Sequence, residues 1–152
     1  MELKFRVFAH ISKPVHEVYE AVADPGQLSH YFTTGGAKGR LESGKTVTWD
    51  FHDFPGAFPV TVVEAKQDER IVLEWKANEK GAAEPYNTRV TMSFKPVVGD
   101  TRTLVEIAEE GWHETEAGLQ ASYGNSMGWT GMLLALKVWL EHRINLREGL
   151  YK

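Results

Sequence analysis

The sequence of 152 residues contains no cysteine, which excludes disulfide bonds, thiolate metal ligands and cysteine nucleophiles. It also has no run near the ~20 apolar residues that a membrane-spanning helix requires, so no membrane insertion is expected. A basic segment followed by an apolar one, the layout of a secretory signal peptide, is missing from its start. These absences predict a cytoplasmic protein.

Concentrated positive charge is also missing. The 17 Lys and Arg residues are outnumbered by 21 Asp and Glu residues, and the net charge is −4, so no nucleic-acid partner is expected. The six histidines form no pair with metal-ligand spacing, which predicts no metal site. Phosphate-binding glycine loops and the G-x-S-x-G motif are absent, and no cofactor is expected.

In the first part of the sequence the spacing of apolar residues changes once, from that of a strand to that of a helix. Residues 3–11 alternate between two sets of side chains, one of them apolar, the period-2 pattern of a half-buried strand. Ser12 can cap a following helix, and Pro14 suits its first turn, where a missing N–H costs nothing. Apolar residues at i, i+3, i+4 and i+7 over residues 15–22 predict an amphipathic helix.

Asp24 and Pro25 end this helix and begin a short second one, and residues 33–36 are predicted to form a turn. Strand and turn patterns then follow one another from about residue 37 to 110, as is typical of an antiparallel meander. The predicted strands are centred on the apolar positions of residues 47–51, 60–63, 71–75, 90–94 and 105–107.

The last third of the sequence is helical in pattern. Apolar residues recur every three or four positions from Trp129 to Ile144, which predicts a long helix over roughly residues 120–146, with Arg143 and Arg147 near its C-terminal end. Only this helix is long enough to cover the apolar face of the meander. We therefore predict a single α+β domain over residues 1–152, with six or seven antiparallel strands curled around the C-terminal helix.

Three segments resemble a known family: HISKPVHEVYEAVADPGQLSHYF near the start, ERIVLEW in the middle and GWTGMLLALKVWLE near the end. They are similar to the SRPBCC (START-like) superfamily, and most of all to its Aha-type branch, named after activators of the heat-shock-protein-90 ATPase. The resemblance covers residues 3–145. It implies a helix-grip fold with a cavity between sheet and long helix that takes apolar molecules. Members range from carriers to cyclases, so the fold leaves function open.

The sequence is rich in aromatic residues that must share one interior. Each of them suits core packing, but their number also predicts the lining of a cavity. The residues expected to line it are Trp49, Phe51, Trp75, Met92, Tyr123 and Met127. Gly124, Gly128 and Gly131 lie on one face of the predicted helix, where each costs ~1 kcal/mol relative to alanine. They indicate either a close approach of helix and sheet or room for a ligand, above all at Gly128.

Glu109 is the polar residue that the strand pattern singles out. If Val105 and Ile107 face the core, period-2 alternation places Glu109 on the same face, at the end of its strand. A carboxyl group there can bind a ligand, and Aha-type relatives often carry a polar residue at this position. With His113 it is also the one candidate pair for acid–base catalysis, although an exposed loop position suits His113 better.

Three functions fit these patterns. The favoured one is a binding protein for a small apolar or amphipathic molecule, which needs only a cavity and a few polar contacts. The second is an enzyme of the cyclase or isomerase type that uses Glu109 and His113. The third, a chaperone partner that activates an ATPase, is the least favoured, because those activators carry a further N-terminal domain and the predicted fold occupies residues 1–152. A homodimer remains open.

Overall fold

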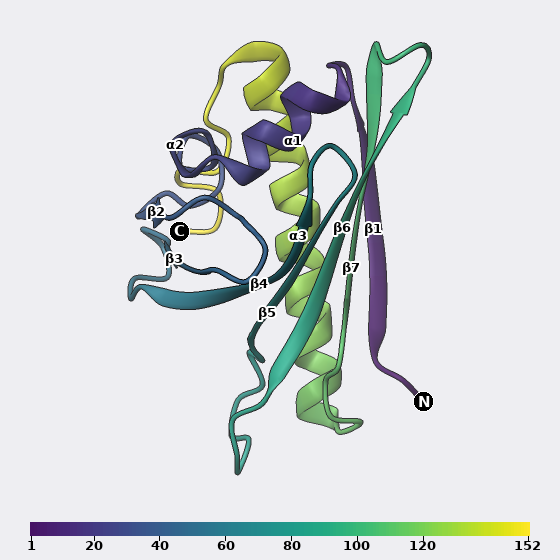
Figure 1. The fold of residues 1–152 in the computed structure, drawn as a ribbon. Coiled ribbons are helices and arrows are strands. Elements are labelled where there is room, and N and C mark those ends of the chain that lie inside the picture. The colour runs from purple at the N-terminus through teal and green to yellow at the C-terminus, as the bar shows by residue number, and fades with distance from the viewer.

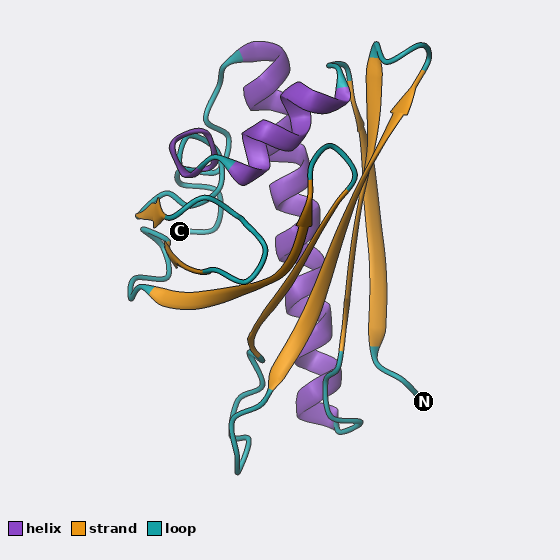
Figure 2. Ribbon diagram, in the orientation of Figure 1, coloured by secondary structure: helices purple, strands orange, loops and turns teal.

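The computed structural model describes residues 1–152 as seven strands and three helices (Figures 1 and 2). In chain order the elements are β1 (Lys4–Ile11), α1 (Val15–Ala23), α2 (Pro25–Leu28), β2 (Gly36–Lys38), β3 (Thr46–Asp50), β4 (Phe58–Lys66), β5 (Arg70–Lys76), β6 (Asn87–Val97), β7 (Arg102–Glu110) and α3 (Glu116–His142). None of the helices combines the length and hydrophobicity needed to cross a bilayer.

All seven strands belong to one antiparallel sheet with the order β1-β7-β6-β5-β4-β3-β2. The sheet curls around α3, as Figure 1 shows, and this arrangement confirms the predicted α+β helix-grip fold. A register shift between Val62 and Glu64 interrupts the pairing of β4 with β5, and such bulges bend a strand and increase its twist. The short strand β2, which pairs with β3, begins at the last residue of the predicted turn over residues 33–36.

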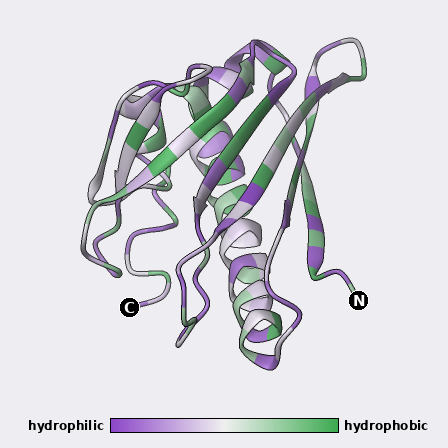
Figure 3. Cartoon of the chain, turned by 60° about the horizontal axis from the view of Figure 1, so that its bottom comes forward, coloured by the Kyte–Doolittle hydropathy of each residue, from purple (hydrophilic) through white to green (hydrophobic).

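The core lies between the concave face of the sheet and α3. Hydropathy alternates along the strands (Figure 3), because successive side chains point to opposite faces. In β7, for example, Val105, Ile107 and Glu109 are buried, while Glu106 and Ala108 between them are partly exposed. The helix contributes buried residues such as Trp129, Leu133 and Leu136 to the same core. Burial of these side chains is the main force that holds α3 against the sheet.

The beginning of α1 differs from the prediction. The residue at the N-cap is Pro14 in an extended conformation, so Ser12 lies too early to cap the helix. The backbone N–H of Val15 instead donates to the carboxylate of Asp100, at 2.8 Å, from the turn between β6 and β7. A carboxylate at a helix N-terminus satisfies a free donor and complements the helix dipole. A tertiary contact therefore supplies the cap.

The long helix α3 lies about four residues earlier than predicted. Thr115 caps it by accepting a hydrogen bond from the backbone N–H of Gly118 at 3.0 Å. It ends at His142, because Arg143 adopts a left-handed conformation with φ 57°. Arg147 therefore lies beyond the helix, in a C-terminal tail of residues 143–152. Figure 1 shows this tail returning past β2 and β3.

Candidate ligand-binding cavity

A largely apolar cavity of about 860 Å³ opens between α3, the strands β4 and β5, and the C-terminal tail. Its volume lies within the ~300–1,000 Å³ typical of small-molecule sites. Aromatic side chains are the largest group in its wall, which also contains a few polar groups. The lining residues are Phe32, Phe51, Phe54, Phe58, Pro59, Trp75, Lys76, Ala77, Asn78, Gly124, Asn125, Met127, Gly128, Trp129, Arg147 and Tyr151.

The structure brings some of the predicted site residues to this cavity and not others. Phe51, Trp75, Met127 and Gly128 line this cavity. Three other predicted residues do not, and they are Trp49, Met92 and Tyr123. Trp49 and Met92 point to the concave side of the sheet but are buried in the core, each 1% exposed. Tyr123 is exposed to solvent on α3 and does not line the cavity, although its neighbour Gly124 does.

Five of the lining aromatics contact one another in a closed circuit, which we call the aromatic cage. The circuit runs from Phe32 to Phe51 (ring centroids 5.0 Å apart), Phe58 (6.0 Å), Trp75 (5.9 Å), Trp129 (5.3 Å) and back to Phe32 (5.5 Å). These distances are those of stabilising aromatic pairs. The rings hold one another in place, and all five line the cavity.

The glycines of α3 have two different roles. A Cβ atom at Gly128 would meet no other atom within 4 Å, so the missing side chain leaves open space in the cavity wall. A Cβ at Gly131 would instead collide with the hydroxyl group of Tyr151. The glycine face thus combines room beside the cavity with a close approach of the C-terminal tail. The expected close approach of helix and sheet is not found at these glycines, since the neighbour of Gly131 is the tail.

Glu109 is completely buried, at 0% exposure, and its carboxylate lies directly behind the cavity wall. Four side chains donate hydrogen bonds to it. Trp129 Nε1 donates to Oε1 at 2.8 Å and Trp75 Nε1 to Oε2 at 3.0 Å. Thr88 Oγ1 donates to Oε2 at 2.6 Å, and Asn125 Nδ2 lies 3.1 Å from both oxygens. Three of these donors (Trp75, Asn125 and Trp129) themselves line the cavity.

The electrostatic environment of Glu109 is unusual for a carboxylate. Burial raises the pKa of Glu109 above its ordinary value, and the hydrogen bonds from Thr88, Trp75, Trp129 and Asn125 offset this effect only in part. All four neighbours are uncharged, and none of the salt bridges in the protein involves Glu109. Its charge is stabilised by dipoles rather than by a cation.

The structure does not bring Glu109 and His113 together. The ring of His113 stacks on Tyr86 with centroids 3.7 Å apart, and its Nδ1 lies 3.8 Å from the Glu79 carboxylate. The reason is local: Gly111, with φ 107°, ends the strand conformation of β7 and redirects the chain. His113 and Glu79 belong instead to a cluster that attaches the loop after β5 to the start of α3.

The C-terminal tail forms one wall of the cavity. Arg147 and Asp53 make a bidentate, buried ion pair with N–O distances of 2.5 and 3.0 Å. The guanidinium group also lies over the rings of Phe51 and Tyr151, 5.4 and 4.8 Å from their centroids. The hydroxyl of Tyr151 reaches the backbone of α3 at the carbonyl of Met127. These contacts hold the tail in place as one wall of the cavity.

Sequence reasoning missed several residues that shape the cavity. The largest are Phe32, Phe58, Trp129, Arg147 and Tyr151. Phe58 and Trp129 belonged to the aromatics expected to share the interior but not to the predicted site, and Arg147 was assigned to the helix end. The one available signal was the spacing of Asn125 and Trp129, a polar residue and an indole one helical turn apart, which suits contact with a shared partner.

A curled antiparallel sheet that grips a long C-terminal helix, with a cavity between them, defines the helix-grip class of proteins. The family profile described as "Activator of Hsp90 ATPase homolog 1-like protein" matches residues 12–141. The chain belongs to this family, and the resemblance of its sequence to the Aha-type branch is confirmed. No curated protein matches the sequence.

Solved structures of similar fold agree with this assignment. The protein SSP2350 from Staphylococcus saprophyticus is 23% identical with a TM-score of 0.74, and the match covers 97% of this chain and 96% of that one. The Aha1 dimer from Colwellia psychrerythraea is 20% identical (TM-score 0.72, 91% and 96% covered). CalU16 from Micromonospora echinospora is 20% identical (TM-score 0.68, 91% and 74% covered). At these identities the likeness concerns the fold alone.

Proposed function

We propose that the protein binds a small apolar or amphipathic molecule in the cavity between α3, β4, β5 and the C-terminal tail. The observation that carries this proposal is the largely apolar cavity of about 860 Å³, part of whose wall is the aromatic cage. Burying a ligand against such surface is favourable by about 25 cal/mol per Å². Open space at Gly128, in the middle of a helix, supports the same proposal.

The enzymatic alternative receives less support. A general base needs to reach a proton of the substrate at ~3 Å. Glu109 is instead surrounded by four donors and lies behind Trp75, Asn125 and Trp129, while His113 belongs to another cluster. The contacts of Glu109 support a positioning role, because its carboxylate orients both indoles of the cage.

A homodimer is compatible with this proposal. The Aha1 protein from Colwellia psychrerythraea, which shares the fold, is described as a dimer. In this chain the outer face of α3 exposes Tyr123, Met127 and Leu134 to solvent. Met127 also lines the cavity, so a contact between two copies at this face would lie close to its mouth.

A neutral apolar fluorophore such as N-phenyl-1-naphthylamine is expected to bind with one-to-one stoichiometry and to quench tryptophan emission by energy transfer. The physical reason is that Trp75 and Trp129 form part of the cavity wall. Phe8 provides the control, since its ring is exposed on β1, outside the core. Phe8→Ser should leave the affinity unchanged. Absence of saturable binding, or its loss in this variant, would contradict the proposal.

A further inference from the structure

The buried carboxylate of Glu109 lacks the positive partner that buried charges normally have. Removing an ion from water is costly, and proteins usually offset the cost with an ion pair or a metal. Here no group of metal-ligating side chains is present, and the neighbours of Glu109 are two indoles, a hydroxyl and an amide. A ligand that carries a positive charge would supply what the protein itself leaves out.

Three nitrogen donors favour the ionised form of this carboxyl group, against the burial that raises its pKa. An indole N–H can only donate, and each carboxylate oxygen receives one, from Trp129 at Oε1 and from Trp75 at Oε2. Asn125 adds a further donor between the oxygens. Donors of this kind stabilise a carboxylate more than a neutral acid, because hydrogen bonds to a charged acceptor are the stronger ones.

The two indoles connect this negative charge to the cavity. An N–H that donates to a carboxylate is polarised by it, and hydrogen-bonded groups in a low dielectric polarise one another. Electron density on the rings of Trp75 and Trp129 is thereby increased. The faces of tryptophan rings attract cations more strongly than those of other aromatics. Both rings belong to the cage, so the cavity presents an aromatic surface backed by an anion.

The rim of the same cavity already holds cations over aromatic rings. The guanidinium group of Arg147 lies over Phe51 and Tyr151, and the ammonium group of Lys152 lies 4.8 Å from the centroid of Phe54. The charge of Arg147 is compensated by Asp53. In contrast, no side-chain cation of the protein lies over Trp75 or Trp129 in the interior of the cage.

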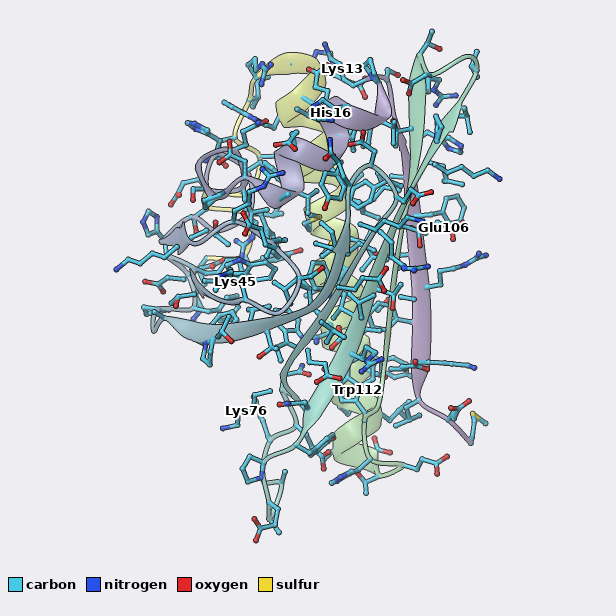
Figure 4. All side chains as sticks on the ribbon, in the orientation of Figure 1. Lys13, His16, Lys45, Lys76, Glu106 and Trp112 are labelled. Carbon is cyan, nitrogen blue, oxygen red and sulfur yellow. The ribbon has the colours of Figure 1, made fainter.

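Positive charge near the mouth is weak. Lys76 is the one lining cation without an ion pair in the protein, and Figure 4 shows its side chain pointing away from the ribbon. Its ammonium group is solvated, and water screens its effect on the interior. The buried charge that dominates inside is therefore the negative one of Glu109.

We propose that the ligand of this cavity is a hydrophobic organic cation, an amine or quaternary ammonium group that carries an apolar body. The ammonium group lies against Trp75 and Trp129, close to the Glu109 carboxylate, and the apolar part fills the cage toward Phe51 and Phe58. This inference rests on the proposed function, since it names the class of ligand for the same site.

Three probes with the same chain and different head groups test the charge preference: decyltrimethylammonium, decan-1-ol and decanoate, each below its micelle concentration. Isothermal titration calorimetry of the full chain is expected to show the cation binding about tenfold more tightly than the other two. Glu109→Gln should reduce this advantage to about twofold or less. Glu110→Gln removes the same charge from an exposed position next along β7 and should preserve it.

The outcomes separate the two proposals. Binding of decanol with the same affinity as the cation, or tighter binding of decanoate, would refute the cation preference and leave the binding function intact. Failure of all three probes to bind would refute both. A cation preference that persists in Glu109→Gln, or disappears equally in Glu110→Gln, would assign it to the net charge of the protein and overturn the role of the buried carboxylate. If Glu109→Gln does not fold, the order of the three probe affinities on the unmodified chain decides whether the cavity prefers a cation.

Discussion

Replacing Asp53 by alanine is expected to lower the free energy of unfolding by about 3 kcal/mol, measured by urea denaturation at neutral pH. Asp53 and Arg147 form a bidentate ion pair whose side chains are only 7% and 6% exposed. Removing the carboxylate leaves a buried guanidinium group without a partner, which costs more than the loss of an exposed pair. The C-terminal wall of the cavity should become less stable as a result.

The pH dependence of this effect has a defined sign. The hydrogen bonds from Arg147 lower the pKa of Asp53 below its ordinary value of 3.8 in the folded protein. The stabilisation is therefore complete above that ordinary value and is lost as the pH falls through the lower pKa of the folded state. The stability difference between the unmodified protein and Asp53→Ala should be constant near neutral pH and shrink under acidic conditions below about pH 4.

Glu148 offers a matched control in the same tail. Its carboxylate contacts Nδ1 of His52 at 3.1 Å, and both side chains are more than half exposed. An exposed pair of this kind contributes at most about 1 kcal/mol. Glu148→Ala should thus have little effect on unfolding. Equal stability of the Asp53→Ala and Glu148→Ala proteins would show that burial of the ion pair has no energetic consequence.

The second large effect is expected for Gly128→Leu, which should weaken binding of an apolar probe at least about tenfold without destabilising the fold. The new side chain would occupy open space in the cavity wall, and the volume that it fills is lost to the ligand. Leucine is also a better helix former than glycine, by roughly 0.8 kcal/mol. Probe titrations and thermal unfolding of the same preparation measure both quantities.

Two neighbouring positions on α3 serve as controls for Gly128→Leu. Thr130 is exposed and lies outside the cavity lining, so Thr130→Leu should leave probe binding unchanged. Gly131→Leu should instead destabilise the protein, because a side chain there collides with Tyr151. If Gly128→Leu lowered stability in the same way and left affinity unaltered, Gly128 would serve packing and the cavity would not be the binding site.

Much of the architecture follows from local patterns in the sequence. The period of apolar residues distinguishes the strands from α3, and the short connections between strands make the meander antiparallel. The same reasoning placed Glu109 on the inner face of β7, since it shares the alternation of Val105 and Ile107. Its burial was predictable for this reason, because face selection is a property of neighbouring residues in one strand.

The ends of elements were less predictable, since contacts distant in sequence determine them. The cap of α1 comes from Asp100 in another turn, and α3 ends where Arg143 turns left-handed. Alternation likewise indicates which face a residue occupies but not its depth. Trp49 and Phe51 share one face, yet Trp49 is enclosed by Phe32 and Trp75 while Phe51 lines the cavity.

The sequence by itself determined the kinds of elements, their order, the curled sheet around a helix, and the inward direction of Glu109. Only the tertiary structure decided what Glu109 meets. Its donors come from three elements: Trp75 from β5, Thr88 from β6, and Asn125 and Trp129 from α3. The ion pair of Asp53 with Arg147 likewise joins residues 94 positions apart. Such groups meet because the packing of the whole chain places them together, and no local period in the sequence encodes that meeting.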